Sequence, residues 1–363
     1  MFINLHVNLH VVRAVPCCMV LLFSLLAVDQ DLRAAEPILA PERIVFGSCC
    51  KQDQPQPIWD SIVAAKPNLF LMIGDNIYGD SPDMIVLKAK WDKLGAQPGF
   101  QKLKQTCPIL ATWDDHDYGA DDAGAEFSMK RESQQLFLDF FGEPMGTARR
   151  KQEGVYASYE YGPPERRVQV ILTDTRYHRS PLKKNGLKRG DPGFRGPYAE
   201  NTDGDVTVLG ETQWKWLEGE LRKPAKVRIV ASSVQILAND HQWEKWGNFP
   251  AERERLFKLI RETNANGVIL LSGDRHSAEI SRDDKVVGYP LFDITSSSLN
   301  APGTLNKVEA NSLRTGPLFS PENFGVVAFD WKQADPAISM ELRNVKGEPV
   351  EVQQIRLSQL TPR

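Results

Sequence analysis

Short, largely apolar runs constrain the fold of this chain more than any other sequence feature. The clearest are residues 68–73, 167–173 and 267–272, and each is followed by Asp or Gly-Asp. A strand that is apolar on both faces lies in a sheet covered on both sides, as in α/β proteins. Amphipathic segments such as 57–66 and 126–141 alternate with these runs and predict helices. The alternation indicates a layered α/β fold.

The remaining segments fit the same plan. We expect further strands at residues 43–48, 155–161 and 227–234, antiparallel strands between 326 and 357, and helices at 84–104 (broken near 95–99), 212–221 and 251–264. Residues 177–206 form a long polar stretch, and loops of this length are usually functional or disordered. With 363 residues and no internal repeat or linker, residues 36–363 are expected to form one domain.

The first 35 residues have a different character. Arg13 precedes an apolar stretch, residues 14–28, and the small pair Ala34-Ala35 follows. The apolar core is shorter than the roughly 20 residues of a membrane-spanning helix. We therefore expect a signal peptide over residues 1–35 and export to the periplasm or the cell exterior, with no membrane span after cleavage. The alternatives are an uncleaved anchor and a misassigned start methionine.

The charge balance argues against two classes of partner. The chain has 44 Lys and Arg residues against 47 Asp and Glu residues, a formal net charge of -3. Binding to nucleic acid or to an anionic membrane surface would need a basic stripe, which the sequence does not show. We expect a monomer that acts on a small molecule.

Potential ligands follow five of the predicted strands. They are Cys49, Asp75 with Tyr78, Asp114 to Asp117, Asp174 with Arg176, and Asp274 with His276. Ligands of α/β sheets bind beyond the carboxyl ends of the strands, so these groups converge on one cavity if the strands are parallel neighbours. The densest stretch holds three carboxylates and an imidazole in four positions, and such acids repel one another unless cations lie between them.

The residue types indicate the chemistry. Aspartates suit hard cations such as Ca²⁺, Mg²⁺ or Mn²⁺, whereas a Tyr phenolate and a Cys thiolate suit a more Lewis-acidic ion such as Fe³⁺. Two metals can hold an attacking hydroxide and the leaving oxygen of a phosphate ester. Arg176 would add a fork matched to phosphate oxygens, although a structural ion pair with Asp174 is equally compatible with its position.

The motifs resemble those of the alkaline phosphatase D (PhoD-like) metallophosphatases. The matching stretches, in the family's order, are Phe46-Gly47-Ser48-Cys49, Gly74-Asp75-Asn76-Ile77-Tyr78, Trp113-Asp114-Asp115-His116-Asp117, Asp174-Thr175-Arg176 and Gly273-Asp274-Arg275-His276. The resemblance implies a four-layer metallophosphoesterase sandwich, with two mixed sheets flanked by helices. It also implies a ferric ion with Ca²⁺ partners, and release of phosphate from mono- or diesters outside the cytoplasm by a metal-bound hydroxide.

The resemblance also implies roles for individual residues. Cys49 and Tyr78 would bind the ferric ion, Asp75 would bridge metals, and Asp115, Asp274 and His276 would complete the ligand set. His116 occupies the position of the histidine that protonates the leaving group. Asp121 departs from the family, whose members commonly have Asn there, and its carboxylate would bind Ca²⁺ more strongly.

Several of these positions have simpler interpretations. Cys49 could be a buried structural thiol, Tyr78 a packed aromatic residue, and His116 part of a local turn. Asp117 is as compatible with accepting a hydrogen bond from His116 as with binding metal. Cys50 is expected to pack in the core or to pair with Cys107. His178 and His241 are expected at the surface, and His241, which lies near Trp243 and Trp246 in the sequence, could alternatively line the rim of a cleft.

A different function class also fits the sequence. A non-catalytic exported protein could keep the metal site in order to capture phosphate, and the extra carboxylate of Asp121 is the feature that favours it.

Overall fold

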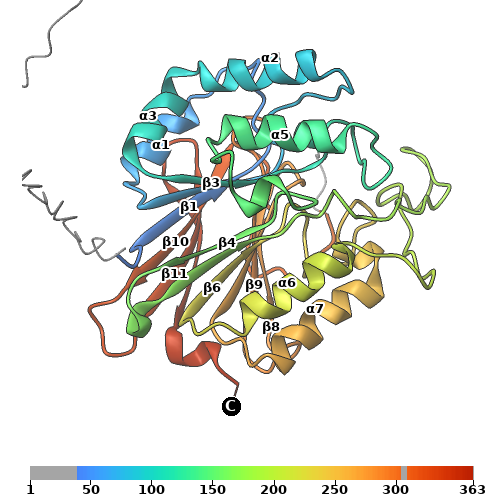
Figure 1. The fold of residues 1–363 in the computed structure, drawn as a ribbon. Helices are drawn as coiled ribbons and strands as arrows, with labels where there is room; N and C mark the ends of the chain where they lie inside the picture. Colours follow the sequence, from blue (N-terminus) through green and yellow to red (C-terminus); the bar gives the residue numbers. More distant parts are fainter. Residues whose placement is uncertain (1–38, 304–308, 363) are drawn as a thin grey trace, which may run out of the picture. The chain divides into compact units, whose positions relative to one another are not determined.

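A computed structural model describes residues 39–303 and 309–362. Within these ranges the strands form two mixed six-stranded sheets that pack face to face, and helices cover both outer faces (Figure 1). The predicted α/β class and the four-layer sandwich implied by the family resemblance are therefore confirmed. The predicted signal peptide, residues 1–35, lies outside the described residues. None of the described helices is long and apolar enough to cross a membrane.

The first sheet has the strand order β12-β11-β10-β1-β2-β3. Its parallel half consists of β1 (Arg43–Gly47), β2 (Leu69–Ile73) and β3 (Ile109–Thr112), and its antiparallel half of β10 (Asn323–Asp330), β11 (Ala337–Asn344) and β12 (Pro349–Arg356). The helices on its outer face are α1 (Ile58–Ala64), α2 (Met84–Gly95), α3 (Pro98–Thr106) and α5 (Lys130–Phe140). The predicted break near 95–99 separates α2 from α3.

The second sheet has the strand order β4-β5-β6-β7-β9-β8. Its central strands β5 (Val168–Leu172), β6 (Val227–Ala231), β7 (Val268–Ser272) and β9 (Leu291–Ser296) are parallel, and β4 (Ala157–Tyr161) and β8 (Ala278–Asp283) form antiparallel edges. Helices α6 (Gly210–Leu221) and α7 (Pro250–Glu262) cover its outer face. Short turns are α4 (Asp115–Tyr118), η1 (Ala148–Arg150), η2 (Pro164–Arg166), η3 (Trp246–Asn248) and η4 (Leu357–Leu360).

Strands β8 and β9 were not predicted, because acidic residues interrupt their apolar pattern. Asp293 in β9 accepts hydrogen bonds from the backbone of Ile236 at 2.8 Å and from Ser272 Oγ at 2.7 Å. Glu279 in β8 accepts one from Gln235 Nε2 at 2.7 Å. Buried polar groups are tolerated when they are hydrogen-bonded in this way, but these partners are distant in the sequence.

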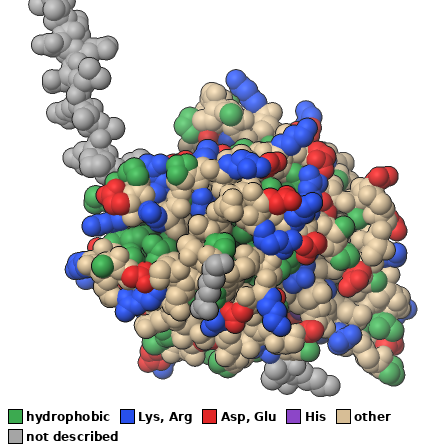
Figure 2. All heavy atoms as spheres, turned by 90° about the horizontal axis from the view of Figure 1, so that it is seen from below, with side chains coloured by type: hydrophobic (Ala, Val, Ile, Leu, Met, Phe, Trp, Pro, Cys, Tyr) green, Lys and Arg blue, Asp and Glu red, His purple; other side chains and the backbone are tan. Residues whose placement is uncertain are grey.

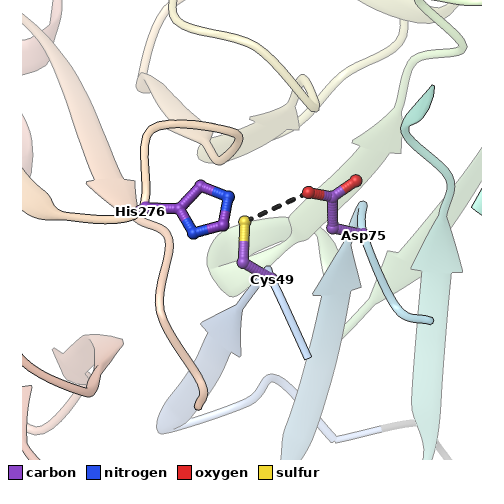
Figure 3. A group of neighbouring side chains, drawn as sticks. All are labelled: Cys49, Asp75 and His276. Carbon is purple, nitrogen blue, oxygen red and sulfur yellow. Dashed lines mark hydrogen bonds between the residues drawn. The ribbon is translucent and has the colours of Figure 1, made fainter. Parts of the chain in front are cut away.

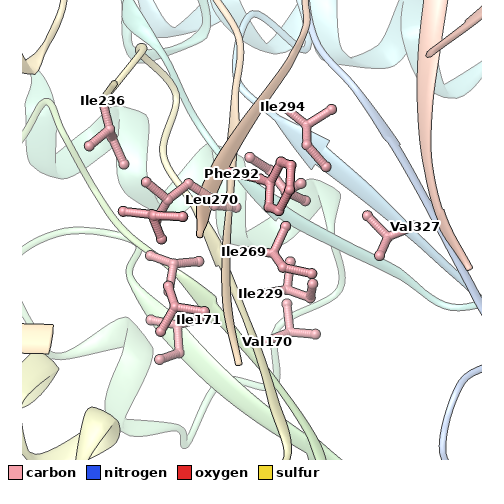
Figure 4. Packing of buried hydrophobic residues seen from close by; sticks show 14 of the residues in the cluster. Val170, Ile171, Ile229, Ile236, Ile269, Leu270, Phe292, Ile294 and Val327 are labelled. Atoms are coloured by element: carbon pink, nitrogen blue, oxygen red, sulfur yellow. The ribbon is translucent and has the colours of Figure 1, made fainter. Parts of the chain in front are cut away.

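The alternation of side chains along the strands divides the core into two clusters. Ile44 and Phe46 of β1 belong to a cluster that extends from the space between the sheets to helices α6 and α7, and that also contains the residues labelled in Figure 4. Val45 points the other way and belongs to the second cluster, which includes Trp59 of α1 and Trp91 of α2. Both faces of β1 are therefore buried, as its apolar sequence predicted. On the face seen in Figure 2, cationic and anionic side chains are interspersed.

Candidate active site

Three groups of potential metal ligands lie together beyond the ends of β1, β2, β3 and β7. They are Cys49, Asp75 and His276 (Figure 3); Asp75, Asp115 and His116; and Asp114, Asp115 and Asp274. Within each group, one ligand atom per residue lies within 4.8 Å of the others. Asp75 and Asp115 each belong to two groups, so the three groups form one continuous array.

The backbone is strained where the strands end. Cys49, Asp75, Asp274 and His276 have φ values of 58°, 48°, 67° and 53°, in the left-handed region that residues other than glycine rarely adopt. Such conformations cost about 1 kcal/mol or more each, and they concentrate at functional sites. They turn the chain sharply after each strand and bring side chains from both sheets to a common centre.

Gly74 allows β2 and β3 to end close together. Its φ is +112°, and a Cβ atom there would lie 2.6 Å from Cβ of Asp114 and 3.0 Å from Cβ of Ser233. A side chain at this position would displace the ligand-bearing turn of Asp114.

Cys49, Asp75, Tyr78 and His276 make direct contacts. The Cys49 thiol and the Tyr78 hydroxyl each donate to Asp75 Oδ2 at 3.3 Å, and Tyr78 Oη lies 3.2 Å from Nε2 of His276. Nδ1 of His276 lies 2.5 Å from the carbonyl oxygen of Ala301, which orients the imidazole. Burial, together with neighbouring acids, raises the pKa of Cys49, Asp75 and Tyr78 well above their usual values.

The carboxylates are short of partners, and the site therefore fits bound cations. Oδ1 of Asp75, Oδ2 of Asp114 and Oδ1 of Asp115 are buried without a hydrogen-bond partner among the described residues. Burial raises the pKa of Asp114 to about 6 and that of Asp274 well above its usual value. Cations among these oxygens would supply the missing partners and stabilise the charged forms.

Comparison with known proteins agrees with this arrangement. A family model described as PhoD-like phosphatase matches residues 44–313, about three quarters of the chain. The chain belongs to the PhoD-like phosphatase family. The resemblance inferred from the sequence motifs is thus confirmed.

Three individual proteins resemble this PhoD-like chain. Alkaline phosphatase D of Bacillus subtilis (strain 168) is 24% identical over 199 residues, which cover 47% of this chain and 31% of that relative's length. The structure of PhoD has a TM-score of 0.68 at 16% identity and covers 90% of this chain and 73% of its own. A dimetal phosphatase from Danio rerio has a TM-score of 0.52 at 13% identity, covering 89% and 100% respectively. At these identities the two solved structures show that the fold is shared.

His116 of the PhoD-like chain stands at the edge of the array. Its side chain is 18% exposed, and Nδ1 lies 2.7 Å from Oδ1 of Asp80. Its ring packs against that of Tyr78 with centroids 4.2 Å apart. Burial alone would lower the pKa of His116, but Asp75, Asp80 and Asp115 raise it to about 11. The contact between Nδ1 and Asp80 holds the imidazole in place.

Arg176 is wholly buried, and its guanidinium forms ion pairs with Asp114 and Glu244. It donates to Oδ1 of Asp114 and, through Nη1, to Glu244 at 3.0 Å, and it lies 3.9 Å from Oδ1 of Asp115. Its partner is not the side chain of Asp174, which instead accepts backbone hydrogen bonds from Val155, Arg176 and Tyr177. Burial raises the pKa of Asp115, but the charges of Arg176 and His116 outweigh this and lower that pKa below its usual value.

The other residues singled out from the sequence take varied positions. The side chain of Asp121 is 79% exposed and lies outside the three ligand groups, with its Oδ1 3.9 Å from Nε2 of His116. Asp117 accepts hydrogen bonds from the backbone of Asp114 at 2.7 Å and from Asn76. It therefore holds the α4 turn together.

Two expectations about other residues are also resolved. Cys50 and Cys107 are free buried thiols, which matches the packing alternative rather than a disulfide. The prediction of a surface position was wrong for His241, which is 2% exposed, because the loop 235–245 folds into the protein.

A cavity of about 390 Å³ opens beside the array. Its lining includes Asp115, Asp274 and His276, and also residues that sequence reasoning missed: Lys51, Asp122, Arg189, Trp243, Glu244 and Arg275. None of these residue types is a distinctive signal in a polar stretch, so only their proximity to the array distinguishes them. Lys51 and Arg275 could have been suspected from the sequence, because each lies within two residues of a predicted metal ligand, Cys49 and Asp274 respectively.

Proposed function

We propose that this PhoD-like chain is a metal-dependent phosphoesterase that hydrolyses phosphate mono- or diesters. The observation that carries the proposal is the continuous ligand array in which Asp75 and Asp115 are each shared between two groups. Shared carboxylates are typical of sites that hold more than one metal ion. The cavity beside the array leaves room for a small ester.

The residue types suggest how the metals would be distributed. Cys49, Asp75 and His276 of the array, together with the adjacent hydroxyl of Tyr78, are suited to Fe³⁺. Asp115 and Asp274, joined by Asp114, offer hard oxygen ligands suited to Ca²⁺ or another divalent cation. When bound, such ions supply positive charge and Lewis acidity at the reacting phosphate. Because the side chain of Asp121 is exposed, we infer that it makes at most a contact with a metal ion at the outer edge of this set.

His116 and Arg176 would have different roles. His116 lines the cavity, and because Asp80 holds its Nδ1, its Nε2 is available to protonate the leaving alcohol. Arg176 is fully enclosed by acids, so we infer that it positions Asp114 and Asp115 rather than contacting the ester. In this role it orients ligands for the metal ions.

We also propose that residues 1–35 are a signal peptide and that residues 36–363 act as an exported monomer in the periplasm or outside the cell. The charged and apolar pattern of the N-terminal sequence supports this. Intact-mass measurement of protein recovered from the medium or periplasm tests it: an uncleaved mass would contradict the signal assignment. Light scattering on the same sample measures the oligomeric state.

The catalytic proposal is tested with p-nitrophenyl phosphate and its bis-ester. We expect turnover of at least one ester, loss of activity on chelation, and recovery when metal is restored. Asp75→Asn should lower kcat at least about 100-fold, because it removes a ligand shared between two groups. Asp205→Asn, at an exposed aspartate before α6, is the matched control and should retain wild-type activity.

Two results would reject the proposal. One is the absence of turnover over a broad ester panel with metals confirmed by elemental analysis. The other is near-wild-type kinetics for Asp75→Asn. Calorimetry that showed tight phosphate binding without turnover would instead support a phosphate-capture function.

A further inference from the structure

One wall of the cavity is built from two arginines and a tryptophan. The guanidinium carbons of Arg189 and Arg275 lie 5.6 Å and 5.4 Å from the ring centroid of Trp243. Phe194 packs edge-on against the same indole, with centroids 5.7 Å apart. Arg189, Trp243 and Arg275 all line the cavity, and we call these three residues the arginine wall.

The two arginines of the wall are not equivalent. Arg275 is buried, and its Nη2 donates to both carboxylate oxygens of Glu309 at 2.8 Å and 2.7 Å. Arg189 is exposed on the long loop 177–206 and forms no ion pair with any described residue. A guanidinium that rests on an aromatic face keeps its N–H groups directed outward, where they can bind an anion. Arg189 is therefore the free cation of the arginine wall.

Trp243 is held firmly enough to support this cation. Its backbone N–H donates to Nδ1 of His241 at 3.2 Å. Nε2 of His241 then carries the proton and donates to Oε1 of Gln235 at 3.0 Å, and Nε2 of Gln235 donates to Glu279 at 2.7 Å. This chain of hydrogen bonds anchors the backbone of Trp243 to β8, and Phe194 of the loop 177–206 packs against the indole.

The arginine wall begins next to the ligand array, because Arg275 directly follows Asp274. It continues outward to Arg189 along the same cavity. A phosphate held at the array would direct its alcohol portion toward this wall or toward the solvent. An acidic group on that alcohol would meet Arg189, and charge-assisted bonds to a guanidinium fork are among the stronger polar contacts.

We propose that Arg189, supported by Trp243, is a specificity-determining residue that binds a second phosphate group on the substrate's alcohol. The inference rests on the phosphoesterase function proposed above and adds a substrate class to it. The enzyme would favour esters that carry two phosphates over otherwise identical esters that carry one.

The test compares phosphate release from fructose 1,6-bisphosphate and fructose 6-phosphate. In Arg189→Ala, the ratio of kcat/KM for the bisphosphate to that for the monophosphate should fall about tenfold, chiefly through KM. Arg189→Lys should keep part of the preference, because it retains the charge but not the fork. Lys188→Ala removes a charge from the neighbouring exposed residue, does not touch the cavity lining, and should leave the ratio unchanged.

The possible outcomes separate this inference from the proposed function. An unchanged ratio in Arg189→Ala, or equal losses on both sugars, would overturn the role of Arg189 while leaving the hydrolase assignment intact. If the metal-loaded wild type hydrolysed neither these sugars nor the p-nitrophenyl esters, the proposed function would fail. Calorimetric binding of the two sugar phosphates would then decide: weaker binding of the bisphosphate alone to Arg189→Ala supports the inference, and equal binding to both proteins overturns it.

Discussion

The buried Arg176 network yields the sharpest prediction about stability. The side chains of Arg176, Asp114 and Glu244 are 0%, 1% and 2% exposed, so their charges are compensated by one another and by buried neighbours such as Arg179, which lies 3.1 Å from Glu244. Arg176→Met keeps most of the side-chain volume but removes the positive charge. Removing one partner of a buried ion pair costs about 3–5 kcal/mol, because the remaining charge is left without compensation.

The loss converts to a measurable change in melting temperature. The unfolding entropy of a domain of roughly 300 residues is about 0.6–0.7 kcal/mol/K, so Tm should fall by about 5–8 °C. Scanning calorimetry on chelator-treated protein measures this without a bound cation taking the place of the guanidinium. Because Glu244→Gln removes a charge that Arg176 compensates, we expect the double variant to lose less stability than the sum of the single variants.

The same variant distinguishes the two roles considered for Arg176. If it positions Asp114 and Asp115, stability and metal affinity should fall together, and KM should change little once metal is saturating. A stability loss below about 1 kcal/mol, accompanied by a large rise in KM, would refute this reasoning. It would restore the substrate contact that the sequence suggested.

Two further predictions concern the support of the site. Gly74→Ala should lower the unfolding free energy by about 3 kcal/mol in a thermal assay and weaken metal binding, because the left-handed backbone and the 2.6 Å approach to Asp114 leave no room for a methyl group. The control is Gly146→Ala, whose added methyl group would meet nothing within 4 Å. This control should change the unfolding free energy by less than about 0.5 kcal/mol in the same assay. Burial, with Arg275 and other nearby cations, lowers the pKa of His241 well below its usual value, so the unfolded state binds a proton that the folded state does not. The unfolding free energy should therefore be unaffected by His241 above about pH 6.5 and should decline below that pH. Urea unfolding at pH 7.5 and 5.5 measures this decline, and His241→Gln should make it shallower by up to about 1.4 kcal/mol per pH unit. If the variant left the decline unchanged, the buried neutral imidazole would be contradicted.

Much of the fold was predictable because its signals are local. The apolar runs at 68–73, 167–173 and 267–272 became β2, β5 and β7, and the break near 95–99 became the gap between α2 and α3. Hydrophobic periodicity and glycine placement act over a few residues, so they can be recognised without tertiary information. Strands β8 and β9 escaped recognition because the partners that satisfy Glu279 and Asp293 come from other segments.

The ligand motifs were visible for the same reason, but their assembly was not. The sequence indicated that Cys49, Asp75, Asp115 and Asp274 follow strands and suit metal ions. The family resemblance implied that Asp75 bridges metals, but the sequence could not indicate which of these residues come from which sheet, or that Asp115 is also shared between ligand groups.

The sequence by itself determined which family the chain resembles and which residues are candidates for the chemistry, because both are written in short contiguous motifs. The tertiary structure decided what each side chain faces. It enclosed Arg176 among acids, left Asp121 exposed, buried His241, and brought Arg189 onto Trp243. These pairings join residues dozens of positions apart, and they depend on how the two sheets pack and how the long loops return to the site. Packing and electrostatic compensation act through space, so only the folded chain specifies them.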